Sequence, residues 1–115
     1  MRQLKPPSRF KVREFSASQL AEYLAEHSPR LIDVREQWEY DTCHLENSEL
    51  FPMQSIPAVM QHWDKTKEMV IICHHGIRSR QVCRFLDHYG FENVINLNGG
   101  IDQWALQVDR NMPTY

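Results

Sequence analysis

The chain has 115 residues, of which 42% are hydrophobic and 24% charged, and its net charge at neutral pH is −2. These values are typical of one small soluble domain, and they give no reason to expect nucleic acid or a membrane surface as the main partner. No apolar run is long enough to cross a bilayer, and the basic N-terminus lacks the apolar stretch of a secretory signal. The three cysteines are an odd number without zinc-site spacing, which argues against a disulfide framework and predicts a reducing, cytoplasmic location.

Predicted strands alternate with predicted helices along the chain. Short apolar or alternating runs indicate strands at residues 10–13, 31–34, 48–51, 70–73 and 94–97. Apolar side chains at helical spacing indicate helices over residues 17–27, 35–41, 56–63, from Ser79 to Gly90, and 101–108. Residues 1–9 are expected to form a loose lead-in and residues 108–115 a tail, so that residues 1–115 make one domain. This alternation predicts an α/β fold, with a mostly parallel central sheet of about five strands and helices on both faces.

Several residues mark where the helices begin, end and face. Ser16 and Gln19 form a capping box for the first helix, which Pro29 terminates, and Gly90 is the predicted stop of the fourth. The side chains expected to face inward are Leu20, Tyr23, Leu24 and His27 in the first helix, and Val82, Phe85, Leu86 and Tyr89 in the fourth. The three tryptophans, Trp38, Trp63 and Trp104, are expected in the core or in a pocket wall.

The most informative stretch is the end of the strand at residues 70–73 and the loop after it. Cys73 follows an apolar, β-branched run, Gly76 interrupts the pattern, and Ser79 is a candidate cap for the next helix. Ligand sites in such sheets lie at the carboxyl ends of strands. Backbone amides and the helix dipole there favour a thiolate, which is the nucleophilic form of cysteine. The alternative is that Cys73 is an ordinary buried core residue.

Three motifs resemble those of the rhodanese sulfurtransferase family. They are the C-x-x-G-x-R-S pattern of residues 73–79, the sequence Leu-Ile-Asp-Val-Arg-Glu at residues 31–36, and Asn-Gly-Gly-Ile-Asp-Gln-Trp at residues 98–104. The resemblance covers the chain from about Phe15 to Trp104. It implies a rhodanese-like domain whose loop cysteine takes a sulfane sulfur from a donor, carries it as a persulfide and passes it to a thiophilic acceptor. No separate cofactor is expected.

The remaining loop residues are candidates for substrate binding. They are His74, His75, Gly76, Ile77, Arg78 and Ser79. We expect the amides of residues 74–78 to hold the sulfur anion and Arg78 to place a positive charge near an anionic donor. The two histidines are expected to line the pocket mouth or tune the thiol. They are not expected to bind a metal, because adjacent side chains tend to diverge.

The resemblance also singles out Asp33 and Arg35 as supporting residues. Asp33 is expected to accept hydrogen bonds from amides of the Cys73 loop, and Arg35 either borders the pocket or pairs with Glu36 or Glu39. The other two cysteines are expected to be structural, with a resolving thiol as the alternative for Cys83. Cys43 has no such alternative.

Three functions are compared. A sulfurtransferase would use a small anionic sulfur donor such as thiosulfate or a persulfide, and a cyanide or thiol acceptor. A phosphatase is disfavoured, because protein phosphatases place five residues between the cysteine and the arginine, whereas four separate Cys73 from Arg78. A delivery module would serve a protein sulfur carrier or a desulfurase. The tail at 108–115 resembles rhodanese domains fused to adenylyltransferases, apart from Arg110 in place of their usual proline.

Overall fold

Five strands form one sheet in the order β1-β5-β4-β2-β3, and every neighbouring pair is parallel. A computed structural model describes residues 12–115, so the lead-in predicted over residues 1–9 lies outside the described residues. The strands are β1 (Arg13–Phe15), β2 (Arg30–Asp33), β3 (Ser48–Leu50), β4 (Met69–Ile72) and β5 (Val94–Leu97). The α-helices are α1 (Ala17–Leu24), α2 (Gln37–Thr42), α3 (Ile56–Val59), α4 (Ile77–His88) and α5 (Gly100–Gln107). The predicted fold class is therefore confirmed.

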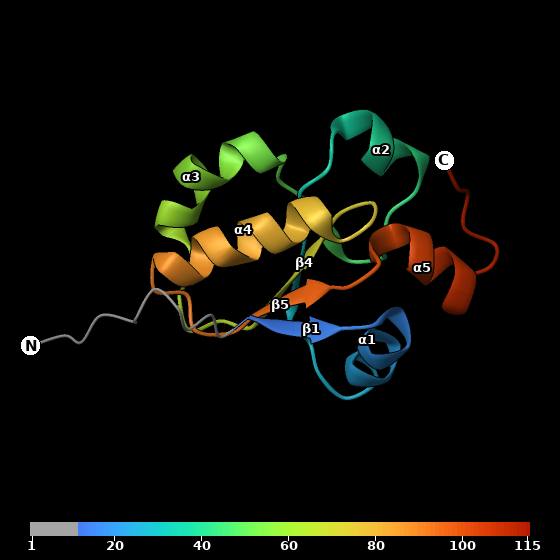
Figure 1. Ribbon diagram of the computed structural model, residues 1–115, viewed down its shortest axis with the longest axis horizontal. Coiled ribbons are helices and arrows are strands. Elements are labelled where there is room, and N and C mark those ends of the chain that lie inside the picture. The colour runs from blue at the N-terminus through green and yellow to red at the C-terminus, as the bar shows by residue number, and fades with distance from the viewer. Residues whose placement is uncertain (1–11) are drawn as a thin grey trace, which may run out of the picture.

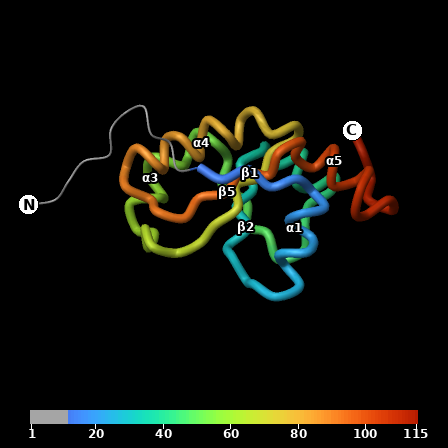
Figure 2. Tube along the Cα trace, turned by 60° about the horizontal axis from the view of Figure 1, so that its bottom comes forward, coloured from blue at the N-terminus to red at the C-terminus, as the bar shows by residue number. Residues whose placement is uncertain are grey.

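Helices cover both faces of this sheet, with α3 and α4 on one side and α1 and α5 on the other (Figures 1 and 2). The central strand β4 serves both layers because successive side chains of a strand point to opposite faces. Met69 and Ile71 pack with the α3 and α4 side chains, whereas Val70 and Ile72 pack with those of α1 and α5. All four residues are fully buried, which explains the uninterrupted apolar run in the sequence.

The first helix is shorter than predicted. The predicted capping box at Ser16 and Gln19 is present, but α1 ends at Leu24 rather than His27. Pro29 disfavours helical geometry in the residue before it, so the chain leaves the helix before reaching the proline. His27 is consequently exposed and stacks on the Tyr23 ring, with centroids 4.0 Å apart, instead of facing the core.

Other element bounds also differ from the prediction. The edge strand lies at Arg13–Phe15, because pairing with β5 sets its register, with Phe15 opposite Leu97. The helix predicted over residues 56–63 is one α-helical turn flanked by two 3-10 turns, Met53–Ser55 and Met60–His62. Tyr89 is 48% exposed at the end of α4, so the prediction that it faces inward is wrong. Trp38 is 60% exposed, which excludes the core as its place and leaves the alternative of a pocket wall.

The carboxyl ends of the inner strands meet at one edge of the sheet. Asp33 of β2 pairs in register with Ile72 of β4, so the chain following each strand emerges at the same place. The segment after α5 returns toward α2, where Tyr115 contacts Trp38 edge to face at 5.4 Å (Figure 1). The predicted tail therefore packs against the same end of the domain as the Cys73 loop.

Candidate active site

The Cys73 thiol lies just beyond β4, beside the first turn of α4, and the residue is 1% exposed. Two backbone amides donate to its sulfur, from Gly76 at 3.1 Å and from Ser79 at 3.3 Å. Gly76 makes this turn feasible, because its φ of +95° is left-handed and it caps α4. Amide donors and a helix N-terminus both stabilise negative charge. The sulfur therefore occupies a setting that suits an anion.

Ser79 has a different role from the predicted helix cap. The helix begins at Ile77, three residues earlier than a Ser79 cap would allow, and the Ser79 side chain is fully buried. The Cys73 thiol donates to Ser79 Oγ at 3.3 Å, and Ser79 Oγ in turn donates to Oδ1 of Asn96. The hydroxyl is thus the link between the sulfur and β5.

Asn96 is a site residue that the sequence did not reveal. It is fully buried in β5, and its amide nitrogen donates to Glu14 Oε1 at 2.9 Å and to the Gly76 carbonyl at 3.2 Å. These two bonds fix the orientation of the amide, so that Oδ1 must face Ser79 as an acceptor. Asn96 therefore holds both the Ser79 hydroxyl and the turn at Gly76.

The amino end of α5 fastens the loop from the other side. The amides of Ile101 and Asp102 donate to the carbonyls of Cys73 and His74, at 2.9 and 3.0 Å. This contact is so close that a Cβ on Gly100 would lie 2.4 Å from both carbonyl oxygens. The Gly-Gly pair in the sequence thus permits two backbone segments to meet directly.

The Arg78 side chain is held by a carboxylate of a neighbouring helix. Its guanidinium donates to both carboxylate oxygens of Glu39 in α2, at 2.8 and 2.9 Å. These hydrogen bonds lower the pKa of Glu39 to about 2, although burial alone would raise it, and they raise the pKa of Arg78. Glu39, which the sequence offered only as a partner for Arg35, therefore balances the charge predicted to face the substrate anion.

Arg35 forms a buried ion pair with Asp33, and not with Glu36 or Glu39 as one of its two predicted roles required. Both side chains are fully buried, and Arg35 Nη2 lies 2.7 Å from Asp33 Oδ2. Because the Asp33 carboxylate is taken up by the amide and guanidinium of Arg35, its predicted bonds to the Cys73 loop are replaced. The remaining guanidinium donors reach the carbonyls of Glu39 and Cys43, at 3.3 and 2.7 Å. This pair holds α2 in place behind the site.

Tyr115 is a second residue that the sequence did not reveal. Its hydroxyl accepts from Arg35 at 2.8 Å and donates to Glu39 at 2.8 Å, while its ring stacks on His74 with centroids 4.0 Å apart. His74 stacks in turn on His75, with ring centroids 3.9 Å apart. The prediction that these two adjacent side chains diverge is therefore wrong. Burial, and then the neighbouring charge of His75, lower the pKa of His74.

The other two thiols are buried away from solvent. Cys83 is fully buried in α4, and burial raises the pKa of its thiol, which disfavours the thiolate that a resolving residue needs. Cys43 is 7% exposed in the opposite layer of the core. All three cysteines are free, and these burial values agree with structural roles for Cys43 and Cys83.

An α/β domain with a cysteine loop between a central strand and a helix is the arrangement implied by the resemblance. Residues 16–107 match the family model described as the rhodanese-like domain, and the chain belongs to this family. A solved relative, the rhodanese-like domain protein from Staphylococcus aureus, superposes with a TM-score of 0.74 at 29% identity, over 80% of this chain and 90% of the other.

Two sequence relatives show different domain contexts. The putative sulfurtransferase YtwF of Bacillus subtilis is 39% identical over 94 residues, which cover 81% of this chain and 90% of YtwF. The adenylyltransferase and sulfurtransferase uba4 of Ogataea parapolymorpha is 37% identical over 93 residues, which cover 79% of this chain. The matched region spans only 24% of uba4, and 30% of the Arabidopsis thaliana rhodanese-like/PpiC domain-containing protein 12. Over residues 12–115, no helix is long and apolar enough to cross a membrane.

Proposed function

We propose that the protein is a sulfurtransferase that carries sulfane sulfur on Cys73. The observation that supports this most directly is the pair of amides, from Gly76 and Ser79, aimed at the Cys73 sulfur from the start of α4. Such a cradle stabilises a thiolate before transfer and a persulfide anion after it. The fold and the name of YtwF agree with this class of reaction.

The proposed reaction has two displacement steps. The Cys73 thiolate attacks the outer sulfur of thiosulfate, so that a new S–S bond forms on the cysteine, the old S–S bond breaks, and sulfite leaves with the bonding electrons. The acceptor, cyanide or a thiolate, then attacks the terminal sulfur and the thiolate is restored. Because the donor product leaves before the acceptor binds, ping-pong kinetics follow. No metal or organic cofactor is required.

The tight loop favours sulfur over phosphate as the transferred group. Both loop amides that contact Cys73 converge on one sulfur atom, and Arg78 is held by Glu39. A phosphatase would need this arginine to clamp a tetrahedral anion. The geometry therefore disfavours a phosphatase, as does the four-residue spacing between Cys73 and Arg78.

Intact-mass analysis of the protein, treated with thiosulfate and then with cyanide, tests the proposal. We expect a gain of one sulfur atom, lost on addition of cyanide with release of thiocyanate. Cys73→Ser should abolish the gain, whereas Cys43→Ser, which alters a buried thiol elsewhere, should retain it. Sulfur uptake by the Cys73→Ser protein would refute the assignment.

The uba4 relative suggests a protein acceptor as a second arrangement of the same chemistry. Its measurable sign would be a Cys73 persulfide that passes rapidly to a carrier protein and slowly to cyanide. A folded protein that takes no sulfur from thiosulfate, but does take it from a desulfurase, would identify a protein donor instead.

A further inference from the structure

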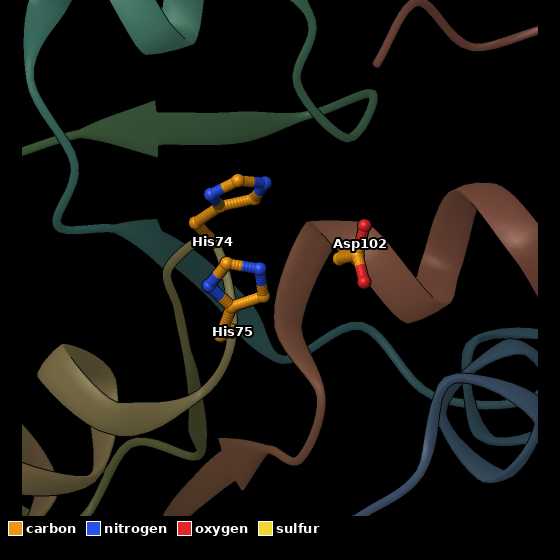
Figure 3. Close-up of side chains that lie close together, drawn as sticks. All are labelled: His74, His75 and Asp102. Atoms are coloured by element: carbon orange, nitrogen blue, oxygen red, sulfur yellow. The ribbon is translucent and has the colours of Figure 1, made fainter. Parts of the chain in front are cut away.

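Three side chains with metal-ligating atoms gather at the mouth of the Cys73 loop. His74 and His75 come from the loop itself and Asp102 from the first turn of α5, and one ligating atom of each lies within 4.8 Å of the others. Figure 3 shows the two rings lying one over the other, each with a ring nitrogen on the side facing the Asp102 carboxylate. We propose that these three residues form a binding site for a divalent transition-metal ion, with Zn²⁺ as the ion that the ligands suit best.

The backbone holds the three residues at a fixed mutual distance. The Asp102 amide donates to the His74 carbonyl at 3.0 Å, which ties the carboxylate-bearing turn to the histidine-bearing loop. The contact at Gly100 leaves no room for the two segments to slide, since even a Cβ there would lie 2.4 Å from the His74 carbonyl oxygen. The ligands are thus brought together by the fold, although 26 residues separate His75 from Asp102 in the sequence.

The side chains are also available to a ligand. Within residues 12–115, none of the three makes a side-chain hydrogen bond, whereas two exposed histidines elsewhere are engaged. His27 Nδ1 lies 3.2 Å from the Tyr23 carbonyl, and His44 Nδ1 lies 2.8 Å from the Tyr40 carbonyl. The loop histidines are held by ring stacking alone, which leaves their nitrogens free.

Two imidazoles and one carboxylate are a donor set that zinc accepts, with further coordination positions left for water or substrate. Metal–ligand bonds of about 2.0–2.2 Å bring ligand atoms to roughly 3–3.5 Å from one another, so the three need to draw together by at most about 1–2 Å. His75 is exposed and Asp102 is half-buried, so both can turn without disturbing the core. The Cys73 sulfur is not part of this set, because its hydrogen bonds are with Gly76 and Ser79.

Calorimetric titration of the full chain with Zn²⁺ tests this site directly, without reference to sulfur transfer. A Cys73→Ser background removes the reactive thiol as a competing ligand. We expect one ion per chain, and a loss of affinity of at least about tenfold for His75→Ala and for Asp102→Asn, since even outer-shell partners of a metal are worth this much. His62→Ala, which removes another exposed histidine, should bind as the background protein does.

Histidine-ring NMR provides a second readout on the same samples. Binding at the proposed site shifts the ring signals of His74 and His75 and leaves those of His62 unchanged. Affinity that is unaltered by both His75→Ala and Asp102→Asn, or the absence of Zn²⁺ uptake at micromolar concentrations, would overturn the proposal. Sulfur uptake and its loss in Cys73→Ser test only the proposed sulfur transfer. The metal site and the sulfur transfer can therefore be refuted independently of each other.

Discussion

The contact between α5 and the Cys73 loop predicts a large effect of Gly100→Ala. The added Cβ would lie 2.4 Å from the carbonyl oxygens of Cys73 and His74, and both obstacles are backbone atoms that cannot rotate away. Gly99→Ala is the matched control. Gly99 also has a left-handed φ, +82° against +60° at Gly100, but the atoms nearest to its Cβ would belong to the side chain of Gln103, with Cγ at 2.4 Å and Cβ at 2.9 Å.

These contacts determine how much unfolding free energy each variant is expected to lose. A left-handed conformation costs an alanine about 1–2 kcal/mol, which the lower entropy of the unfolded chain offsets by about 0.4–1 kcal/mol. Overpacking against backbone adds about 1–3 kcal/mol at Gly100. At Gly99, rotation of the Gln103 side chain relieves the contact with Cγ, and only the contact with Gln103 Cβ, at 2.9 Å, requires a small shift. We therefore expect the free energy of unfolding to fall by about 2–4 kcal/mol in Gly100→Ala and by about 1 kcal/mol in Gly99→Ala. With an unfolding entropy of roughly 2.1 cal/mol/K per residue, these losses correspond to Tm decreases of roughly 8–16 °C and 4 °C.

Thermal unfolding of the two variants, followed by circular dichroism, measures this difference. Sulfur loading of Cys73 by thiosulfate, measured at a temperature where both variants are folded, reports on the loop itself and should fall more in Gly100→Ala. Equal Tm decreases for the two variants would refute the reasoning, because left-handed φ would then account for the whole effect. A smaller decrease for Gly100→Ala would show that the segments are not in direct contact.

Three further predictions concern the polar groups around Cys73. The pKa of Glu39 in the folded protein, about 2, lies below the ordinary value of 4.5, so its stabilising contribution is complete above pH 4.5 and is lost as the pH falls toward 2. Urea unfolding should show Glu39→Gln less stable than the unaltered protein by up to about 3 kcal/mol at pH 7 and by much less at pH 2.5. Asn96→Ala and Ser79→Ala should be non-additive in a double-mutant cycle, with a coupling of about 0.5–3 kcal/mol in unfolding free energy, and additivity would contradict the shared hydrogen bond. Arg78→Ala should raise the KM for thiosulfate only modestly, because Glu39 already balances the charge, and a large increase would show that Arg78 binds the donor.

The parts of the fold that the sequence predicts are those encoded by neighbouring residues. The apolar run before Cys73 and the capping box at Ser16 each act within a few residues, so strand and helix could be identified locally. Ser79 shows the limit of such reasoning. Its residue type suits a helix cap, but the left-handed Gly76 starts the helix earlier and turns the hydroxyl inward, toward a partner on β5.

The site residues that the sequence does not reveal are held by contacts between distant positions. Asn96 is one polar residue in an apolar strand. The orientation of its amide depends on a hydrogen bond to Glu14, which is 82 positions away. Glu39 and Tyr115 are 76 positions apart, and the resemblance of the tail at 108–115 assigns no contact to Tyr115. Periodicity and spacing carry no information about such pairs, because the pairing exists only once the sheet has assembled.

The pairing of charges around Cys73 bears on how the site would recognise a donor. Arg35 is matched by Asp33, Arg78 by Glu39 and Arg80 by Glu14, so these three guanidinium groups near the loop are already balanced by carboxylates. The groups that remain directed at the sulfur are the amide dipoles of the loop, which favour one anionic atom without selecting the rest of the molecule. In the proposed reaction this arrangement suits a site that must release an anionic product such as sulfite and then admit a second nucleophile, since an unbalanced arginine would retain the first anion and slow the exchange.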